Sequence, residues 1–181
     1  MGSAMIKKLC VLSITLLMIS CSKKEKEMQP LAAADLPNVP NFSRVQPDLA
    51  VGGQPNQESL KVAKKAGYKT IINLRPREEW PFDEKSYVED LGMAYVLIPI
   101  VGPESITLEK GKEFQTILNN KDSYPVFIHC GSSNRVGALF ALYEFLENKA
   151  DVETAIQKGK KAGLTSPALE ERVRDLMKSS P

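Results

Sequence analysis

Short apolar runs alternate with longer runs of helical periodicity along most of this 181-residue chain. The apolar runs have the length and composition of strands, and they lie at 49–51, 68–74, 94–100 and 125–128. The periodic runs predict helices at 59–66, 83–91, 107–118, 135–147, 152–162 and 167–177. Strands joined by helices pair in parallel, because parallel neighbours need a long crossover connection. We therefore expect an α/β fold with a mostly parallel central sheet flanked by helices, followed by C-terminal helices. The run at 94–100 is largely apolar, which predicts a strand covered on both faces.

Residues 1–20 have the composition of an export signal. Two lysines precede an apolar run that ends at Ile19 and is about half as long as a membrane-spanning helix needs to be. The end of this run, Met18 to Cys21, resembles a bacterial lipoprotein signal, although Met18 stands where leucine is usual. We expect a lipoprotein signal peptide at 1–20, lipidation of Cys21, and a location in the bacterial cell envelope on the periplasmic or surface face. Cleavage elsewhere, or an uncleaved anchor, is the alternative.

The rest of the chain divides into a linker and one domain. Residues 21–40 are charged and then rich in Ala and Pro, which is typical of a tether, whereas residues 41–181 have globular patterning. Removing Lys7 and Lys8 from the 24 basic residues leaves 22, equal to the 22 acidic residues. This balance provides no basic field for nucleic acid, so we expect no nucleic-acid partner. The partner expected from this part of the chain is a membrane, through the lipid on Cys21.

The domain contains one thiol, Cys130, because Cys10 lies in the expected signal peptide and Cys21 is the expected lipid site. A thiol without an internal disulfide partner is either a small buried side chain or a reactive group. Its neighbours favour the second interpretation. The strand at 125–128 leads through small residues to Arg135, where a helix begins. Loop N–H groups, a helix N-terminus and a guanidinium together favour a bound anion, and they lower the pKa of a neighbouring thiol.

The sequence thus predicts a nucleophile at Cys130 and an oxyanion clamp at Arg135. The anion-binding cradle consists of the four residues between them, which are Gly131, Ser132, Ser133 and Asn134.

This loop resembles the active loop of the cysteine-dependent phosphatases, the protein tyrosine and dual-specificity group. The segments LAVGGQP, YKTIINLRPREE and AYVLIPI precede the loop in the order of that fold, so the resemblance covers roughly residues 42–178. The chain is most similar to bacterial phosphatase-like domains related to the beta-lactamase-hydrolase-like proteins. The resemblance implies hydrolysis of a phosphoryl ester through a cysteinyl-phosphate at Cys130. It also implies that the partner at this site is a small anionic substrate or a phosphoprotein.

Two departures from that group keep alternatives open. Four residues separate Cys130 from Arg135 where the phosphatase loop has five, and four is also the spacing in rhodanese sulfurtransferases. Val136 replaces the serine or threonine that assists breakdown of the phosphoenzyme in the phosphatases. The alternatives are sulfur transfer through a Cys130 persulfide and a non-catalytic module that binds an oxyanion.

Three further side chains are candidates for supporting roles. Glu104 lies on the loop where phosphatases carry their general acid, with Asp83 as a second candidate for that role. Arg75 ends a strand at the edge of the sheet where Cys130 is expected, so it either binds the anion or pairs with a neighbouring glutamate. His129 precedes the nucleophile, and we expect its ring to point away from the pocket and to order the loop. One histidine and one cysteine do not complete a metal site, so we expect neither a metal nor a cofactor.

Overall fold

The computed structural model describes residues 35–180 and is built around one five-stranded sheet. The strands are β1 (Ser43–Gln46), β2 (Leu49–Gly52), β3 (Thr70–Asn73), β4 (Ala94–Leu97) and β5 (Val126–His129). Their order is β1-β2-β5-β3-β4, in which β1 runs antiparallel to β2 and the other pairs are parallel. This confirms the expected α/β fold with a mostly parallel sheet.

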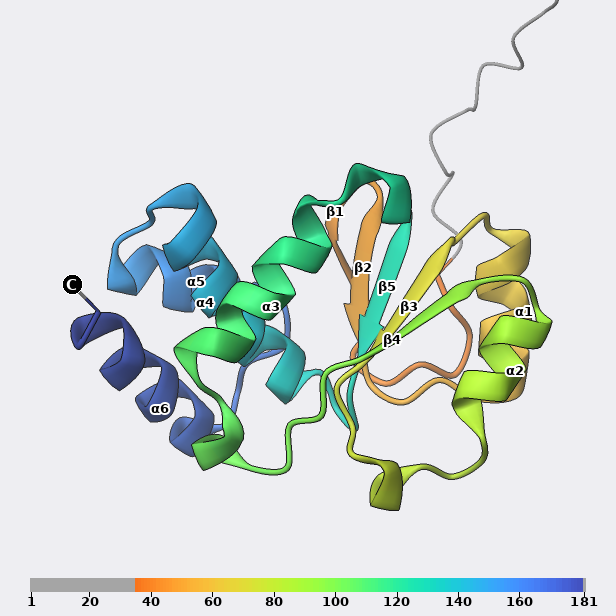
Figure 1. Cartoon of the computed structure of the whole chain (residues 1–181), viewed down its shortest axis with the longest axis horizontal. Coiled ribbons are helices and arrows are strands. Elements are labelled where there is room, and N and C mark those ends of the chain that lie inside the picture. The colour runs from red at the N-terminus through yellow and green to blue at the C-terminus, as the bar shows by residue number, and fades with distance from the viewer. Residues whose placement is uncertain (1–34, 181) are drawn as a thin grey trace, which may run out of the picture.

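Helices cover both faces of the sheet. Within residues 35–180 the α-helices are α1 (Gln57–Lys65), α2 (Glu84–Asp90), α3 (Leu108–Asn119), α4 (Asn134–Asn148), α5 (Val152–Lys161) and α6 (Pro167–Lys178). The same range contains the short 3-10 helices η1 (Arg77–Glu79), η2 (Pro103–Ser105) and η3 (Lys121–Ser123). Figure 1 shows α1 and α2 on one side of the sheet and α3 to α6 on the other. All six expected α-helices are confirmed, each with ends within two residues of the predicted ones.

The two faces of the central strand β5 belong to different parts of the core. Phe127 packs with residues of α1 and α2, whereas Val126 and Ile128 pack with residues of α3 and α4. All four residues of β5 are buried, as a strand covered on both sides must be. Alternation along this strand therefore decides which side chains at its end face α2 and which face α4.

Side-chain caps explain why the helix starts were predictable. A side-chain oxygen at the N-cap accepts a hydrogen bond from a backbone N–H three residues later in α1, α2, α3, α5 and α6. Such a cap satisfies an N–H group that the helix itself leaves without a partner. α4 is the exception, since its N-cap residue Ser133 makes no side-chain cap.

Three expectations about the elements differ from the structure. β4 ends at Leu97 and lies at the edge of the sheet, where its residues are half-buried or exposed, so the expectation of two covered faces is wrong. β1 was not predicted, because its four half-buried residues show no alternation. The packed part also begins before residue 41, since Leu36 and Val39 are buried against the α1 side of the sheet.

Residues 1–34 fall outside the described residues, and with them the expected signal peptide, Cys21 and most of the tether. From residue 35 to residue 180, no helix combines the length and apolar character needed to cross a bilayer.

Candidate active site

Cys130 lies at the carboxyl edge of the sheet, directly after the central strand. Its backbone N–H donates to the carbonyl of Gly52 (3.3 Å), and the carbonyl of His129 accepts from Leu74 (2.9 Å). The nucleophile candidate is therefore held between β2 and β3, and the residue is 1% exposed. Four residues later α4 begins, so the expected succession of strand, short loop and helix is confirmed.

The carbonyl groups of the loop bond to segments on either side. Gly131 accepts from the backbone N–H of Gln54 (3.3 Å), and Ser132 accepts from the side-chain amide of Asn41 (3.0 Å). Ser133 adopts a left-handed backbone conformation, with φ of 70°. A turn of this kind allows successive N–H groups to face a common centre, which is the geometry that binds an anion.

Two polar side chains of the loop contact the α5–α6 connection. The Ser133 hydroxyl donates to the carbonyl of Ala162 (2.9 Å). The Asn134 side-chain oxygen accepts from the backbone N–H groups of Thr165 and Ser166 (2.7 Å each). These two side chains fasten the loop to the C-terminal helices, so any contribution of Ser133 and Asn134 to the cradle comes from their backbone.

Arg135 is fixed by a carboxylate that sequence reasoning did not assign to the site. Its Nη2 lies 2.9 Å from both carboxylate oxygens of Glu79, in η1. Its Nη1 is buried and has no hydrogen-bond partner among the described residues. Desolvation opposes ionisation of Glu79, but hydrogen bonds from Arg135 and Arg75 prevail and lower the pKa of this carboxyl. The guanidinium is thus oriented on one side and left with an available donor on the other.

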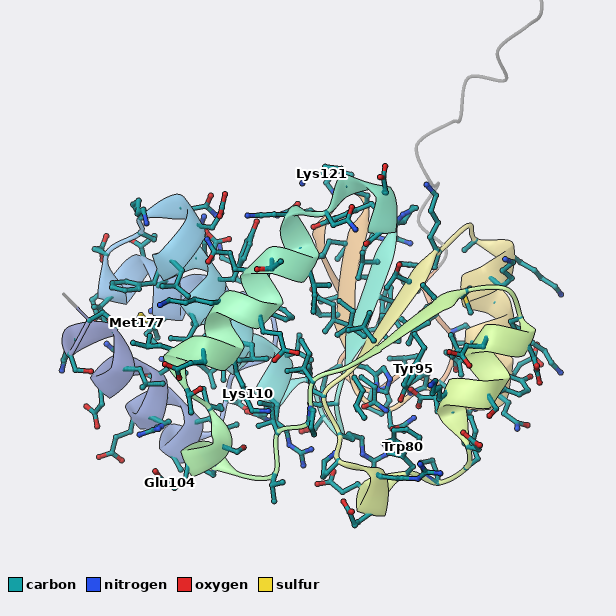
Figure 2. The ribbon with its side chains drawn as sticks, viewed as in Figure 1. Trp80, Tyr95, Glu104, Lys110, Lys121 and Met177 are labelled. Atoms are coloured by element: carbon teal, nitrogen blue, oxygen red, sulfur yellow. The ribbon has the colours of Figure 1, made fainter. Side chains whose placement is uncertain are left out.

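Arg75 joins the same cluster from the end of β3. Its Nε lies 3.2 Å from Glu79, and its Nη1 donates to the side chain of Gln54. Its carbonyl accepts from Trp80 (3.1 Å), which Figure 2 shows below the strands at this edge of the sheet. The structure therefore brings Arg75 and Arg135 together on one carboxylate, and it also contains the pairing with a neighbouring glutamate.

His129 and Cys130 face opposite sides of the sheet. The ring of His129 stacks on Phe127 (5.7 Å between centroids, 18° between planes), and its Nε2 lies 2.7 Å from Glu84 in α2. Cys130 instead belongs to the part of the core that includes α3 and α4. The expected orientation of the histidine away from the nucleophile's side is what the structure shows.

The two candidate general acids are occupied elsewhere. The side chain of Glu104 is 91% exposed, and its carboxylate lies 3.6 Å from Arg172 Nη1 in α6. Its ion pair is therefore with α6 and not with the loop that carries Cys130. Figure 2 shows it at the end of α6, well away from Trp80. Asp83 caps α2, and hydrogen bonds from Ser86 lower the pKa of its carboxyl. The role of Glu104 as an acid therefore rests on the sequence pattern alone.

The part of the chain that the structure describes contains no cluster of three side chains able to hold a metal ion.

A buried cysteine after a central parallel strand, a short loop and an arginine at the start of a helix define a cysteine-dependent phosphatase-like protein. The model of one such family, described as "DSP-PTPase phosphatase fused to NAD+ Kinase", matches residues 36–175. The chain belongs to this family, and the phosphatase interpretation is thereby favoured over sulfur transfer.

Known proteins support the same assignment. A beta-lactamase hydrolase-like protein of Xylella fastidiosa is 34% identical over 106 residues, which is 56% of this chain but 24% of that protein. The chain thus spans about a quarter of the length of this curated relative. A phosphatase structure from Shewanella putrefaciens is 23% identical to this chain, with a TM-score of 0.63. The match covers 78% of this chain and 93% of the Shewanella chain. P. aeruginosa TpbA is 17% identical, with a TM-score of 0.64, and the match covers 85% of this chain and 92% of TpbA. Both structures share the fold.

Proposed function

We propose that this domain hydrolyses a phosphoryl ester through a cysteinyl-phosphate on Cys130. The observation that carries the proposal is the state of Arg135. Glu79 fixes one side of its guanidinium, and the buried Nη1 on the other side lacks a partner in the described part of the chain. A buried donor without a partner is costly, and a phosphoryl oxygen would satisfy it.

The reaction needs two displacements at phosphorus. In the first, the Cys130 thiolate forms the S–P bond as the P–O bond to the leaving group breaks, and the leaving oxygen takes a proton from solvent. In the second, water attacks phosphorus, the S–P bond breaks, and inorganic phosphate leaves with the thiolate restored. Arg135 and the N–H groups from Gly131 to Arg135 stabilise the charge on the equatorial oxygens in both steps.

The substrates we propose are esters with a good leaving group, such as aryl phosphates. Glu79 is held ionised by two arginines, and Glu104 and Asp83 are bound to other partners. A leaving group with a low pKa departs without the help of a positioned acid. The structure of TpbA in complex with phosphotyrosine, an aryl phosphate, supports this choice. The substrate is then either a phosphoprotein or a small aryl phosphate.

The test is turnover of an aryl phosphate by the full chain and by three variants. We expect Cys130→Ser to abolish turnover and Arg135→Lys to lower kcat/KM at least 100-fold, because lysine lacks the planar pair of donors. Cys21→Ser is the matched control, since it removes a thiol outside the domain and should leave turnover unchanged. Equal activity of Cys130→Ser and the parent would refute the proposal.

We also propose that Cys21 carries a lipid that holds the domain at a bacterial envelope membrane, on the periplasmic or surface face. The support is the charged start, the short apolar run and the Met18 to Cys21 segment. Metabolic labelling with an alkynyl fatty acid tests it. The full chain should be labelled and fractionate with membranes, and Cys21→Ser should be unlabelled. Labelling that survives this substitution would overturn the assignment.

A further inference from the structure

Glu84 is a buried carboxylate for which the proposed reaction has no use. It is the first residue of α2, yet it is fully buried, whereas glutamates are seldom buried unless they are paired. One oxygen accepts from the Asn73 side chain (3.1 Å) and lies 2.7 Å from His129 Nε2. The other accepts from the Gln54 side chain (2.5 Å). Three partners offset the cost of burying this charge, so the position of each partner depends on it.

One of these bonds leads to the nucleophile. His129 is the residue before Cys130, and its ring is held between Glu84 and Phe127 at the end of β5. A hydrogen bond from one ring nitrogen fixes the orientation and tautomer of a histidine. Glu84 thereby fixes the side chain at the point where the strand turns into the loop.

Another bond leads to the two arginines that share Glu79. Gln54 donates through its side-chain nitrogen to the buried carboxylate, and its side-chain oxygen accepts from Arg75. Arg75 shares Glu79 with Arg135. The backbone N–H of Gln54 also donates to the carbonyl of Gly131 in the loop (3.3 Å). A continuous series of hydrogen bonds therefore runs from α2 to the clamp.

We infer that Glu84 is a positioning residue whose one carboxylate orients both the histidine before the nucleophile and the glutamine that holds Arg75, the partner of Arg135 on Glu79. This inference rests on the proposed phosphatase function. Glu144 provides a contrast, because it is also buried and ion-paired, with Lys158 (2.7 Å), but it lies on α4 and none of its partners belongs to the site. A purely structural buried carboxylate would behave as Glu144 does.

The experiment compares Glu84→Gln, Gln54→Ala and the matched control Glu144→Gln in the full chain. Four quantities are measured: kcat and KM for an aryl phosphate, the inhibition constant of inorganic phosphate, the rate of Cys130 alkylation by iodoacetamide mapped by mass spectrometry, and the unfolding temperature. Alkylation and its suppression by phosphate need no turnover. They report on the site even if the chain hydrolyses nothing.

We expect Glu84→Gln to lower kcat at least tenfold, to change the alkylation rate, and to raise both KM and the phosphate inhibition constant at least fivefold, since small displacements of reacting groups are costly. Gln54→Ala should raise KM and the inhibition constant but keep kcat within twofold, because it breaks the connection between Glu84 and Arg75 and leaves the contact between Glu84 and His129 in place. Glu144→Gln should lower the unfolding temperature and leave the other quantities unchanged.

Two outcomes would overturn the inference. One is a Glu84→Gln protein that unfolds at lower temperature but keeps its kinetic constants and alkylation rate. The other, decisive if Glu84→Gln does not fold, is an unchanged inhibition constant in Gln54→Ala. If the parent is alkylated at Cys130 with protection by phosphate but shows no turnover, the proposed function fails. The inference about Glu84 is then judged from alkylation and phosphate protection.

Discussion

Gly163, between α5 and α6, gives the sharpest test of how the loop is supported. Its φ is +103°, and a Cβ built there would lie 2.5 Å from Cβ and 2.7 Å from Oγ of Ser133. Ser133 is the left-handed residue of the cradle, and its hydroxyl donates to Ala162. The substitution Gly163→Ala therefore pushes directly on the loop that carries the nucleophile.

Two costs add in this variant. An alanine in a conformation with positive φ costs about 1–2 kcal/mol relative to glycine. Forcing a methyl group into a packed site costs about 1–3 kcal/mol more. We expect a loss of about 2–5 kcal/mol in the free energy of unfolding, measured by urea denaturation, and a fall in the unfolding temperature of roughly 5–20 °C. Turnover measured while the protein is still folded should also fall, because Ser133 must move.

Two further variants make the result interpretable. Gly102→Ala is the matched control, since a Cβ there meets nothing within 4 Å, and we expect a change below about 0.5 kcal/mol. The double variant Gly163→Ala/Ser133→Gly removes the atoms that collide, so it should be more stable than the sum of the single variants predicts. A Gly163→Ala protein within about 0.5 kcal/mol of the parent, or strict additivity in the double variant, would refute the reasoning.

Three other predictions concern carboxylates. Glu79→Gln should lower kcat/KM about tenfold, since Arg135 loses its orientation, and should cost about 1 kcal/mol of stability because the pair is partly exposed. Hydrogen bonds and ion pairs with Arg135 and Arg75 lower the pKa of Glu79 in the folded state. The contribution of Glu79 to stability is therefore present above its unfolded pKa and is lost as the pH falls through its folded pKa. The difference in unfolding free energy between the parent and Glu79→Gln should vanish in acid. Glu104→Gln should change turnover of aryl phosphates less than twofold, because its carboxylate faces Arg172; a loss that grows with the pKa of the leaving group would instead identify it as the general acid.

The fold was largely predictable because its signals are local. Helix starts carry a capping side chain in the sequence, as Asp83 and Ser166 do, and the central strand is a continuous apolar run. The order of the strands and the exposure of an edge strand depend on contacts between distant segments. For that reason 94–100 was expected to be covered on both faces, although β4 lies at the edge of the sheet.

The residues of the site also fall into two groups, those predictable from local sequence and those that depend on contacts between distant segments. Cys130 and Arg135 lie within one short segment, so their chemistry could be predicted from their spacing. Glu79, Glu84 and Gln54 reach the site from the ends of other elements, and in the sequence each is an unremarkable polar residue after a strand or at the start of a helix. A usable signal did exist. Carboxyl ends of parallel strands meet at one edge, so polar residues that follow β2 and β3 belong beside those that follow β5.

The shortened loop shows why its own residues are not enough. A loop with four residues between the cysteine and the arginine must turn sharply, and Ser133 does so with a left-handed φ that a serine adopts only at a cost. The α5–α6 connection offsets that cost, because Ala162 accepts the serine hydroxyl and Gly163 leaves room for its side chain. Asn134 makes the adjoining contact with Thr165 and Ser166. The C-terminal helices are therefore a condition for the geometry of the nucleophile loop, and substitutions in that connection should affect turnover as well as stability.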